Sequence, residues 1–284
     1  MNRRTPINLI AIDLDGTLLT SDKQITPRTV DAIRRAAALG VRVVIASARP
    51  PRSVQPLYDL CGLDTVQINY NGALIWDPIG RRVVLHKPMV PETVRAVIEL
   101  ARSQHPQTLA SIEILDKWYT DKYDPTYVTE TAKFFQPDRI VPFDESLTEP
   151  VTKLMLLGPA PAIVELEGLL ARHFAGLLLV LRIEEYMLQI MHPTAGKSSA
   201  LAAVAELYKV PRAQVMAIGD APNDLGMIQW AGLGIAVNNA HPLVRRAADY
   251  ITASNDEEGA AEAMEMFVCG TGDKVGNRDS KRKK

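Results

Sequence analysis

Two carboxylates follow directly on a short apolar run near the start of this chain, in the sequence Asp13-Leu14-Asp15-Gly16-Thr17. The four residues before them, Leu9 to Ile12, are all apolar, which is typical of a buried strand. Open α/β sheets bind their ligands outside the carboxyl ends of the strands, where these two acids would lie. The pattern therefore predicts a functional site at the end of the first strand.

Further along the chain, the same arrangement of an apolar run and a polar residue occurs twice more. Thr26-Pro27 and Gly40 predict a helix over residues 27–39, and the largely β-branched run 41–46 then ends at Ser47. A third run, residues 215–219, ends at Asp220. Because the carboxyl ends of parallel strands meet at one edge of a sheet, we expect Asp13, Ser47 and Asp220 to lie close together.

Strand and helix signals alternate from the start, which indicates an α/β fold with a doubly wound parallel sheet of the Rossmann type. Between Ser47 and Lys197 lie 149 residues, whereas a single crossover unit needs about 30. The surplus predicts an inserted α+β domain. We expect a core domain of residues 1–86 and 191–269, a cap domain of residues 87–190 and a disordered tail of residues 270–284.

Inside the presumed insertion, local signals predict several elements. We expect a hairpin over 73–86, helices over 91–103 and 160–174, and strands at 177–182 and 186–191.

Composition excludes several classes of function. The formal net charge of −1 gives no reason to expect a nucleic-acid or membrane partner, and no apolar run reaches the roughly 18 residues of a membrane span. The chain contains two cysteines, far apart, so we expect no disulfide framework and a cytoplasmic location. The tail is basic and could contact nucleic acid, although a solvated tail fits its composition better. Oligomeric state is left open.

Phosphoryl transfer to a carboxylate would use each polar group at the predicted sheet edge. It needs a nucleophilic acid, a second acid that moves protons, hard oxygen ligands for Mg²⁺, and donors for the phosphate oxygens. Asp13 and Asp15 are paired acids, and Ser47 supplies a hydroxyl group. Lys197 begins a predicted helix over 197–207, and Asp220, Asn223 and Asp224 lie in a strand-to-helix turn.

These four motifs, in this order and with this gap, resemble those of the haloacid dehalogenase (HAD) superfamily of phosphatases, in particular the Cof type with a large C2 cap. The resemblance extends from Asp13 to the segment 255–259. Two positions depart from the family pattern, because Ala48 and Ser198 stand where glycine is usual. Neither change removes a catalytic group.

The resemblance implies a role for each residue of the motifs. Asp13 would be the nucleophile that forms an aspartyl-phosphate, and Asp15 the general acid and base. Magnesium would be held by the Asp13 side chain, the Asp15 backbone carbonyl and Asp220, with support from Asp224. The phosphate would be bound by Ser47, Lys197 and Asn223 together with backbone groups near Leu14 and Ala48.

The implied activity is Mg²⁺-dependent hydrolysis of a small phosphorylated metabolite, such as a sugar phosphate or a nucleotide. A phosphomutase using the same acids and a non-catalytic binding protein on the same scaffold are the alternatives. Taken singly, the acids could be turn residues or helix caps, Ser47 a hydroxyl at a strand end, and Lys197 a surface lysine.

Overall fold

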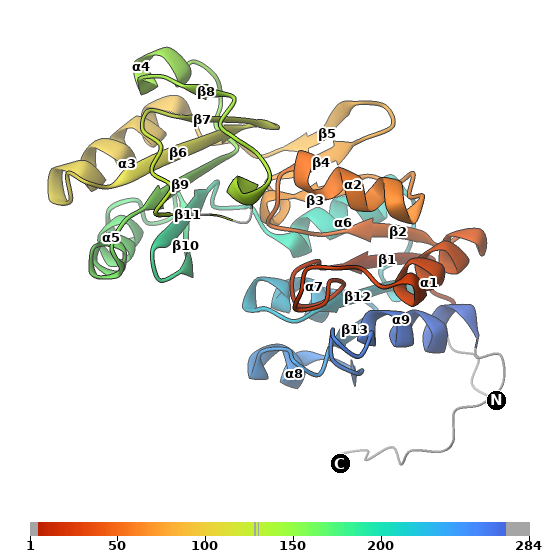
Figure 1. Ribbon diagram of the computed structural model, residues 1–284. Coiled ribbons are helices and arrows are strands. Elements are labelled where there is room, and N and C mark those ends of the chain that lie inside the picture. Colours follow the sequence, from red (N-terminus) through yellow and green to blue (C-terminus); the bar gives the residue numbers. More distant parts are fainter. Residues whose placement is uncertain (1–4, 128, 130, 271–284) are drawn as a thin grey trace.

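The computed structural model describes residues 5–127, 129 and 131–270 of the chain. Figure 1 shows two parts, each built around its own sheet, with a small third sheet beside the first. Of the tail predicted for 270–284, all but Gly270 lies outside the described residues.

The first sheet is entirely parallel and has the strand order β14-β13-β12-β1-β2. Its strands are β1 (Leu9–Ile12), β2 (Arg42–Ile45), β12 (Val215–Gly219), β13 (Leu233–Ala236) and β14 (Tyr250–Ile251). The chain runs outward from β1 in one direction through β2 and in the other through β12. The strand order therefore reverses beside β1, which is where doubly wound sheets bind their ligands.

Six helices cover this sheet in two groups. Helices α1 (Pro27–Ala38), α2 (Pro51–Cys61) and α9 (Gly259–Met264) contact one another through α1, whereas α6 (Lys197–Leu207), α7 (Leu225–Trp230) and α8 (Pro242–Ala247) contact one another through α7. Helix α1 starts where the sequence predicts, because the Thr26 side chain accepts a hydrogen bond from the Thr29 amide and Pro27 needs no partner for its nitrogen. The predicted doubly wound α/β core is confirmed.

The second sheet has six strands in the order β10-β11-β9-β6-β7-β8. These are β6 (Leu109–Ile114), β7 (Lys117–Thr120), β8 (Arg139–Ile140), β9 (Lys153–Leu157), β10 (Leu179–Glu184) and β11 (Met187–Met191). Helices α3 (Pro91–Gln104) and α5 (Ala160–His173) lie on its side away from the first sheet, and the short α4 (Phe143–Ser146) follows β8. An apolar cluster that includes Ile112, Leu154 and Leu188 fills the space under these helices.

The predicted hairpin is present as β4 (Leu74–Asp77) and β5 (Arg82–His86), but it is part of a larger sheet. Strand β3 (Gln67–Asn69) pairs with β4, and its Ile68 bridges to Ala46 at the end of β2. The helices and strands that the sequence predicts inside the insertion are confirmed, while the division of the chain at residues 87 and 190 stays a prediction.

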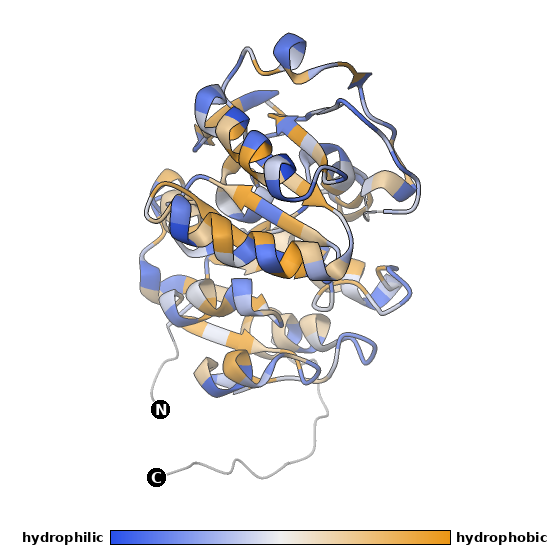
Figure 2. Ribbon diagram, turned by 90° about the vertical axis from the view of Figure 1, so that its left-hand side faces the viewer, coloured by the Kyte–Doolittle hydropathy of each residue, from blue (hydrophilic) through white to orange (hydrophobic). Residues whose placement is uncertain are grey.

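Hydrophobic residues concentrate on the strands and on the inward sides of the helices (Figure 2). Among the described residues, none of the helices combines the length and apolar character that crossing a bilayer requires.

Candidate active site

Two strand ends bring the first acids together. Asp13 continues β1, and its backbone amide donates a hydrogen bond of 3.0 Å to the carbonyl of Ile218 on β12. Because β12 ends at Gly219, the neighbouring Asp220 faces the same edge of the sheet. The Asp13 side chain is almost entirely buried, which isolates its charge from solvent.

Lys197 joins this edge from the first residue of α6. Its Nζ atom lies 2.5 Å from Asp13 Oδ1 and 2.6 Å from Asp224 Oδ1, and the side chain has no exposed surface. Burial alone would lower the pKa of Lys197, but the two carboxylates raise it above its ordinary value. Lys197 is therefore a fixed positive charge at the base of the site, not a surface lysine.

Three carboxylates surround this one lysine. Asp13, Asp220 and Asp224 each offer an oxygen, and these three oxygens lie within 4.8 Å of one another. Burial and the charge of Asp224 raise the pKa of Asp13 well above its usual range, although Lys197 acts in the opposite direction. Three acids, of which Asp13 and Asp224 are buried and Asp220 is partly exposed, against one buried base leave negative charge in excess. A divalent cation with a preference for hard oxygen ligands therefore fits this donor set.

The other bonds of Asp220 and Asp224 determine how each can serve a metal. Asp220 Oδ1 accepts a hydrogen bond of 2.7 Å from Thr17 Oγ1. Both oxygens of Asp224 are already engaged, one by Lys197 and the other by the backbone amides of Asp220 and Ala221 at 3.0 Å each. This arrangement agrees with a supporting role for Asp224.

Gly16 gives the loop after β1 its close approach to these acids. Its φ is +85°, and a Cβ atom at this position would lie 2.6 Å from Asp220 Oδ2. A side chain would therefore be strained and would displace Asp220. The glycine in the first motif is required by the site itself.

The partners of the Asp15 side chain differ from those of the three clustered acids. The Arg49 guanidinium binds both of its oxygens, at 2.8 and 2.6 Å, and Lys23 Nζ lies 2.7 Å from Oδ1. Burial would raise the pKa of Asp15, but Arg49 and Lys23 lower it below its ordinary value. Its side chain does not belong to the three-carboxylate cluster, so only its backbone carbonyl stays a predicted metal ligand.

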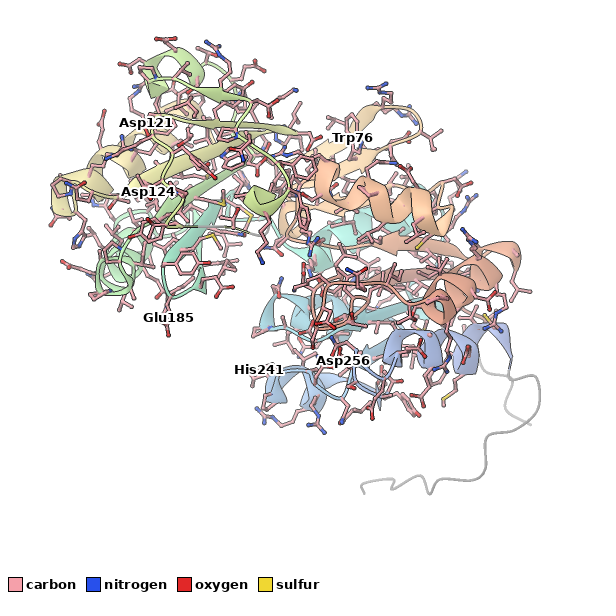
Figure 3. All side chains as sticks on the ribbon, viewed as in Figure 1. Trp76, Asp121, Asp124, Glu185, His241 and Asp256 are labelled. Carbon is pink, nitrogen blue, oxygen red and sulfur yellow. The ribbon has the colours of Figure 1, made fainter. Side chains whose placement is uncertain are left out.

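The segment that carries Lys23 is held at its base by a distant loop. Asp256, which is labelled in Figure 3, accepts hydrogen bonds of 2.7 Å from both the backbone amide and the hydroxyl group of Ser21. This short flap between Thr17 and Thr26 therefore has a defined position over Asp15.

The predicted phosphate-binding residues share one cavity of about 660 Å³ with the acids. Its walls include Ser47, Ala48, Lys197 and Asn223 together with Asp13 and Asp15. Leu14 is buried and does not line the cavity, so its predicted contribution through the backbone stays untested. Asp220 and Asp224 likewise are not among the residues that line it.

Three residues at this site were missed by the sequence reasoning. Arg49 and Lys23 bind Asp15, and Asn71 Oδ1 accepts a hydrogen bond of 2.9 Å from Asn223 Nδ2. Arg49 could have been found, because it comes two residues after Ser47 at a predicted strand end. Nothing in the local sequence pattern marks Lys23 or Asn71.

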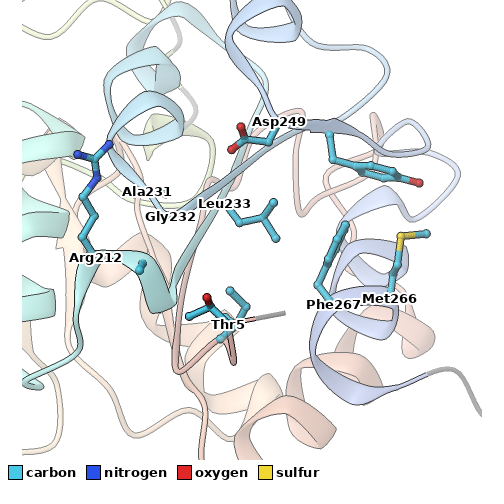
Figure 4. Close-up of a pocket in the computed structure, with 11 residues that line it drawn as sticks. Thr5, Arg212, Ala231, Gly232, Leu233, Asp249, Met266 and Phe267 are labelled. Atoms are coloured by element: carbon cyan, nitrogen blue, oxygen red, sulfur yellow. The ribbon is translucent and has the colours of Figure 1, made fainter. Parts of the chain in front are cut away.

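A second cavity, of about 710 Å³, lies at the opposite edge of the sheet (Figure 4). Its lining includes Thr5, Arg212 and Leu233, which precede or begin strands β1, β12 and β13. The amino ends of parallel strands are not where α/β sheets place their chemistry, and none of the residues of the acidic cluster lies there. We therefore assign the active site to the cavity at the carboxyl edge.

A parallel sheet with buried acids and a lysine at its carboxyl edge defines an α/β enzyme. A model of the haloacid dehalogenase-like hydrolase family matches residues 10–264, and the chain belongs to this family. The resemblance to its capped members that the motifs indicate is thereby confirmed.

Individual relatives match over nearly the whole chain. The Bacillus subtilis protein YxeH is 32% identical over 271 residues, which are 92% of this chain and 98% of YxeH. The 5-amino-6-(5-phospho-D-ribitylamino)uracil phosphatase YcsE of the same organism is 30% identical, covering 92% of this chain and 96% of YcsE. A haloacid dehalogenase-like hydrolase from Bacteroides thetaiotaomicron has a similar solved structure, with a TM-score of 0.85, 32% identity and coverage of 92% of this chain and 99% of that one.

Proposed function

We propose that this phosphatase-family enzyme is a Mg²⁺-dependent phosphomonoester hydrolase that acts on a small phosphorylated metabolite through an aspartyl-phosphate on Asp13. The observation that carries the proposal is the placement of Asp13, which lines the cavity while Lys197 holds one of its oxygens at 2.5 Å. This contact orients the carboxylate as a nucleophile, because a fixed geometry removes much of the entropic cost of attack.

In the proposed first step, an Asp13 oxygen attacks phosphorus, the bond from phosphorus to the ester oxygen breaks, and Asp15 gives its proton to the leaving alcohol. In the second step, Asp15 takes a proton from water, the water oxygen attacks phosphorus, and the bond from phosphorus to Asp13 breaks. Inorganic phosphate leaves, and both acids return to their starting states.

Asp15 must hold a proton to act as the acid, yet Arg49 and Lys23 favour its ionised form. We expect the negative charge of the substrate to draw these two cations away from Asp15, which raises its pKa and allows it to carry the proton. Lys197, Ser47 and Asn223 supply donors for the phosphate oxygens, as does the Nδ2 atom of Asn71, for which the described part of the chain offers no partner.

Magnesium would be held by the side chains of Asp13 and Asp220 and the backbone carbonyl of Asp15, with Asp224 in support. When bound, it would neutralise charge on the phosphoryl group.

The two cysteines are free, and a cytoplasmic location stays a prediction.

The test is the release of phosphate from p-nitrophenyl phosphate and from a broad panel of metabolites in the presence of MgCl₂. We expect Asp13→Asn to lower kcat by about 10⁴-fold or more, because it removes the nucleophile. Asp22→Asn, at an exposed acid nearby, is the matched control, and circular dichroism reports whether each variant folds.

Retained turnover in folded Asp13→Asn protein would refute the role of Asp13. An isomerised product in place of free phosphate would favour a phosphomutase. Failure of the wild-type protein on every ester of the panel would favour a non-catalytic binding protein.

A further inference from the structure

The cap sheet presents one of its faces to the catalytic cavity. Side chains alternate between the two faces of a strand, and the face that includes Leu154 and Leu188 packs against α3 and α5. The residues between them point the other way and line the cavity. This cavity face includes Lys153 and Met155 on β9, Leu179 and Leu181 on β10, and Met187 and Gln189 on β11. Arg182, Glu184 and Tyr186, at the end of β10 and in the turn after it, also line the cavity.

Gln189 is a polar residue inside an apolar row. It pairs with Leu181 on one side and with Met155 on the other, and both neighbours line the cavity. The residue is 5% exposed, and its Oε1 atom has no hydrogen-bond partner within the described residues. A buried amide oxygen without a partner is costly, and because the Gln189 side chain lines the cavity, a bound ligand that donates to this oxygen would remove the cost.

Lys153 is the positively charged group of the same face. Its Nζ atom lies 3.5 Å from Glu113 Oε1 and 5.0 Å from the centre of the Tyr70 ring. Glu113 is also bound by Arg52 at 2.6 Å and by the Tyr70 hydroxyl at 2.8 Å. Because Arg52 also binds Asp116 at 3.0 Å, Lys153 and Arg52 face two carboxylates. The charge of Lys153 is therefore already balanced, which favours a neutral hydrogen-bond acceptor over a second anion as its ligand.

We propose that Gln189 and Lys153 determine specificity for the leaving group of the substrate, and that this group is an uncharged nitrogen heterocycle. Its flat apolar face packs on Met155, Met187 and Leu181, its N–H or O–H group donates to Gln189 Oε1, and its carbonyl or ring nitrogen accepts from Lys153 Nζ. A heterocycle combines these features, whereas a hexose presents hydroxyl groups around its whole rim. The inference rests on the proposed phosphatase activity.

The test compares kcat/KM for uridine 5′-monophosphate and inosine 5′-monophosphate with kcat/KM for glucose 6-phosphate and ribose 5-phosphate. We expect the wild-type enzyme to prefer the two heterocyclic esters at least tenfold. Gln189→Met keeps the length of the side chain and removes its acceptor, so we expect this preference to fall about tenfold, mainly through KM. Lys153→Met should lower it in the same direction.

Gln107→Met, at an exposed glutamine of the same part of the chain, is the matched control and should keep the wild-type preference. A wild-type preference for the sugar phosphates, or an unchanged preference in Gln189→Met, would overturn the assignment. The affinities of Asp13→Asn protein for the same four esters separate the two proposals, because they test recognition without turnover. If no ester is hydrolysed but the heterocyclic ones bind more tightly, only the proposed function fails.

Discussion

Lys197 and Lys153 are both buried on the wall of one cavity, yet the core and the cap hold them in opposite ways. Lys197 has two carboxylate oxygens within 2.6 Å, and its pKa is raised. Lys153 has one carboxylate oxygen at 3.5 Å, and burial lowers its pKa below the ordinary value. The first lysine is a fixed charge, whereas the second is closer to losing its proton.

This difference reflects what each wall has to do. The carboxyl edge of the parallel sheet must stabilise charge that develops during phosphoryl transfer, which requires ions that are already in place. The cavity face of the cap only has to complement a leaving group, and apolar side chains with a few polar groups among them are sufficient for that. The two walls therefore predict different consequences of mutation.

Of the effects that this contrast between the two lysines predicts, the largest is on the core side. Lys197→Met removes the cation between Asp13 and Asp224, and we expect kcat/KM for p-nitrophenyl phosphate to fall by about 10³-fold, as for the loss of a central electrostatic group. Steady-state kinetics measure this change. If Lys153→Met reduced kcat for this small ester as strongly as Lys197→Met, the contrast between the two walls would be wrong.

The excess of negative charge in the core predicts a response to metal. With MgCl₂ at a concentration about 100 times its dissociation constant, we expect the free energy of unfolding to increase by about 2.7 kcal/mol and EDTA to reverse the gain. Asp220→Asn should abolish most of this increase, because it removes one of the three clustered oxygens. Thermal denaturation with and without MgCl₂ measures the effect.

Asp64→Asn, at an exposed acid whose partner Arg42 lies 3.9 Å away, is the control for the loss of a negative charge. An equal gain in stability for wild-type protein and Asp220→Asn would place the metal elsewhere.

The sequence could predict the residues at the carboxyl edge of the parallel sheet far better than those on the cavity face of the cap. Asp13, Ser47 and Asp220 each end an apolar run, and a parallel sheet brings such ends to one edge whatever their separation in the chain. Lys197 was predictable for a related reason, because it begins a predicted helix whose N-terminus favours an anion. Of the partners of Asp15, Arg49 was within reach of the same argument, because it follows Ser47 by two residues, whereas Lys23 comes from a loop without periodicity and was not predictable.

The sequence could not predict the cavity face of the cap, because both faces of the cap sheet are buried. Strands Lys153–Leu157 and Met187–Met191 are buried along their whole length, so their sequences show no alternation of exposed and buried residues. Which face Gln189 and Lys153 belong to depends on strand register and on the side that α3 and α5 occupy. Those features arise from tertiary packing rather than from local sequence.

The smallest effect we expect is a change in how stability depends on pH. The pKa of Lys153 in the folded protein lies below its ordinary value of 10.5, so between these two values the unfolded chain binds a proton that the folded chain has released. Raising the pH through this window therefore favours the folded state, with a slope of at most about 1.4 kcal/mol per pH unit. The raised pKa of Lys197 changes stability in the opposite direction, and the stability that Lys197 contributes is lost only as the pH rises above its ordinary pKa of 10.5.

Urea denaturation at several pH values from 7.5 to 10 gives the difference in unfolding free energy between wild-type protein and Lys153→Met. The change of this difference with pH is the slope. We expect the wild type to gain stability relative to the variant as the pH rises, because only the wild type has a buried ammonium group that can lose its proton. Lys122→Met, at an exposed lysine of the same part of the chain, provides the reference slope. A slope of the opposite sign would mean that Glu113 stabilises the charged form of Lys153 as strongly as the acids stabilise the charged form of Lys197. The contrast between the two lysines would then be wrong.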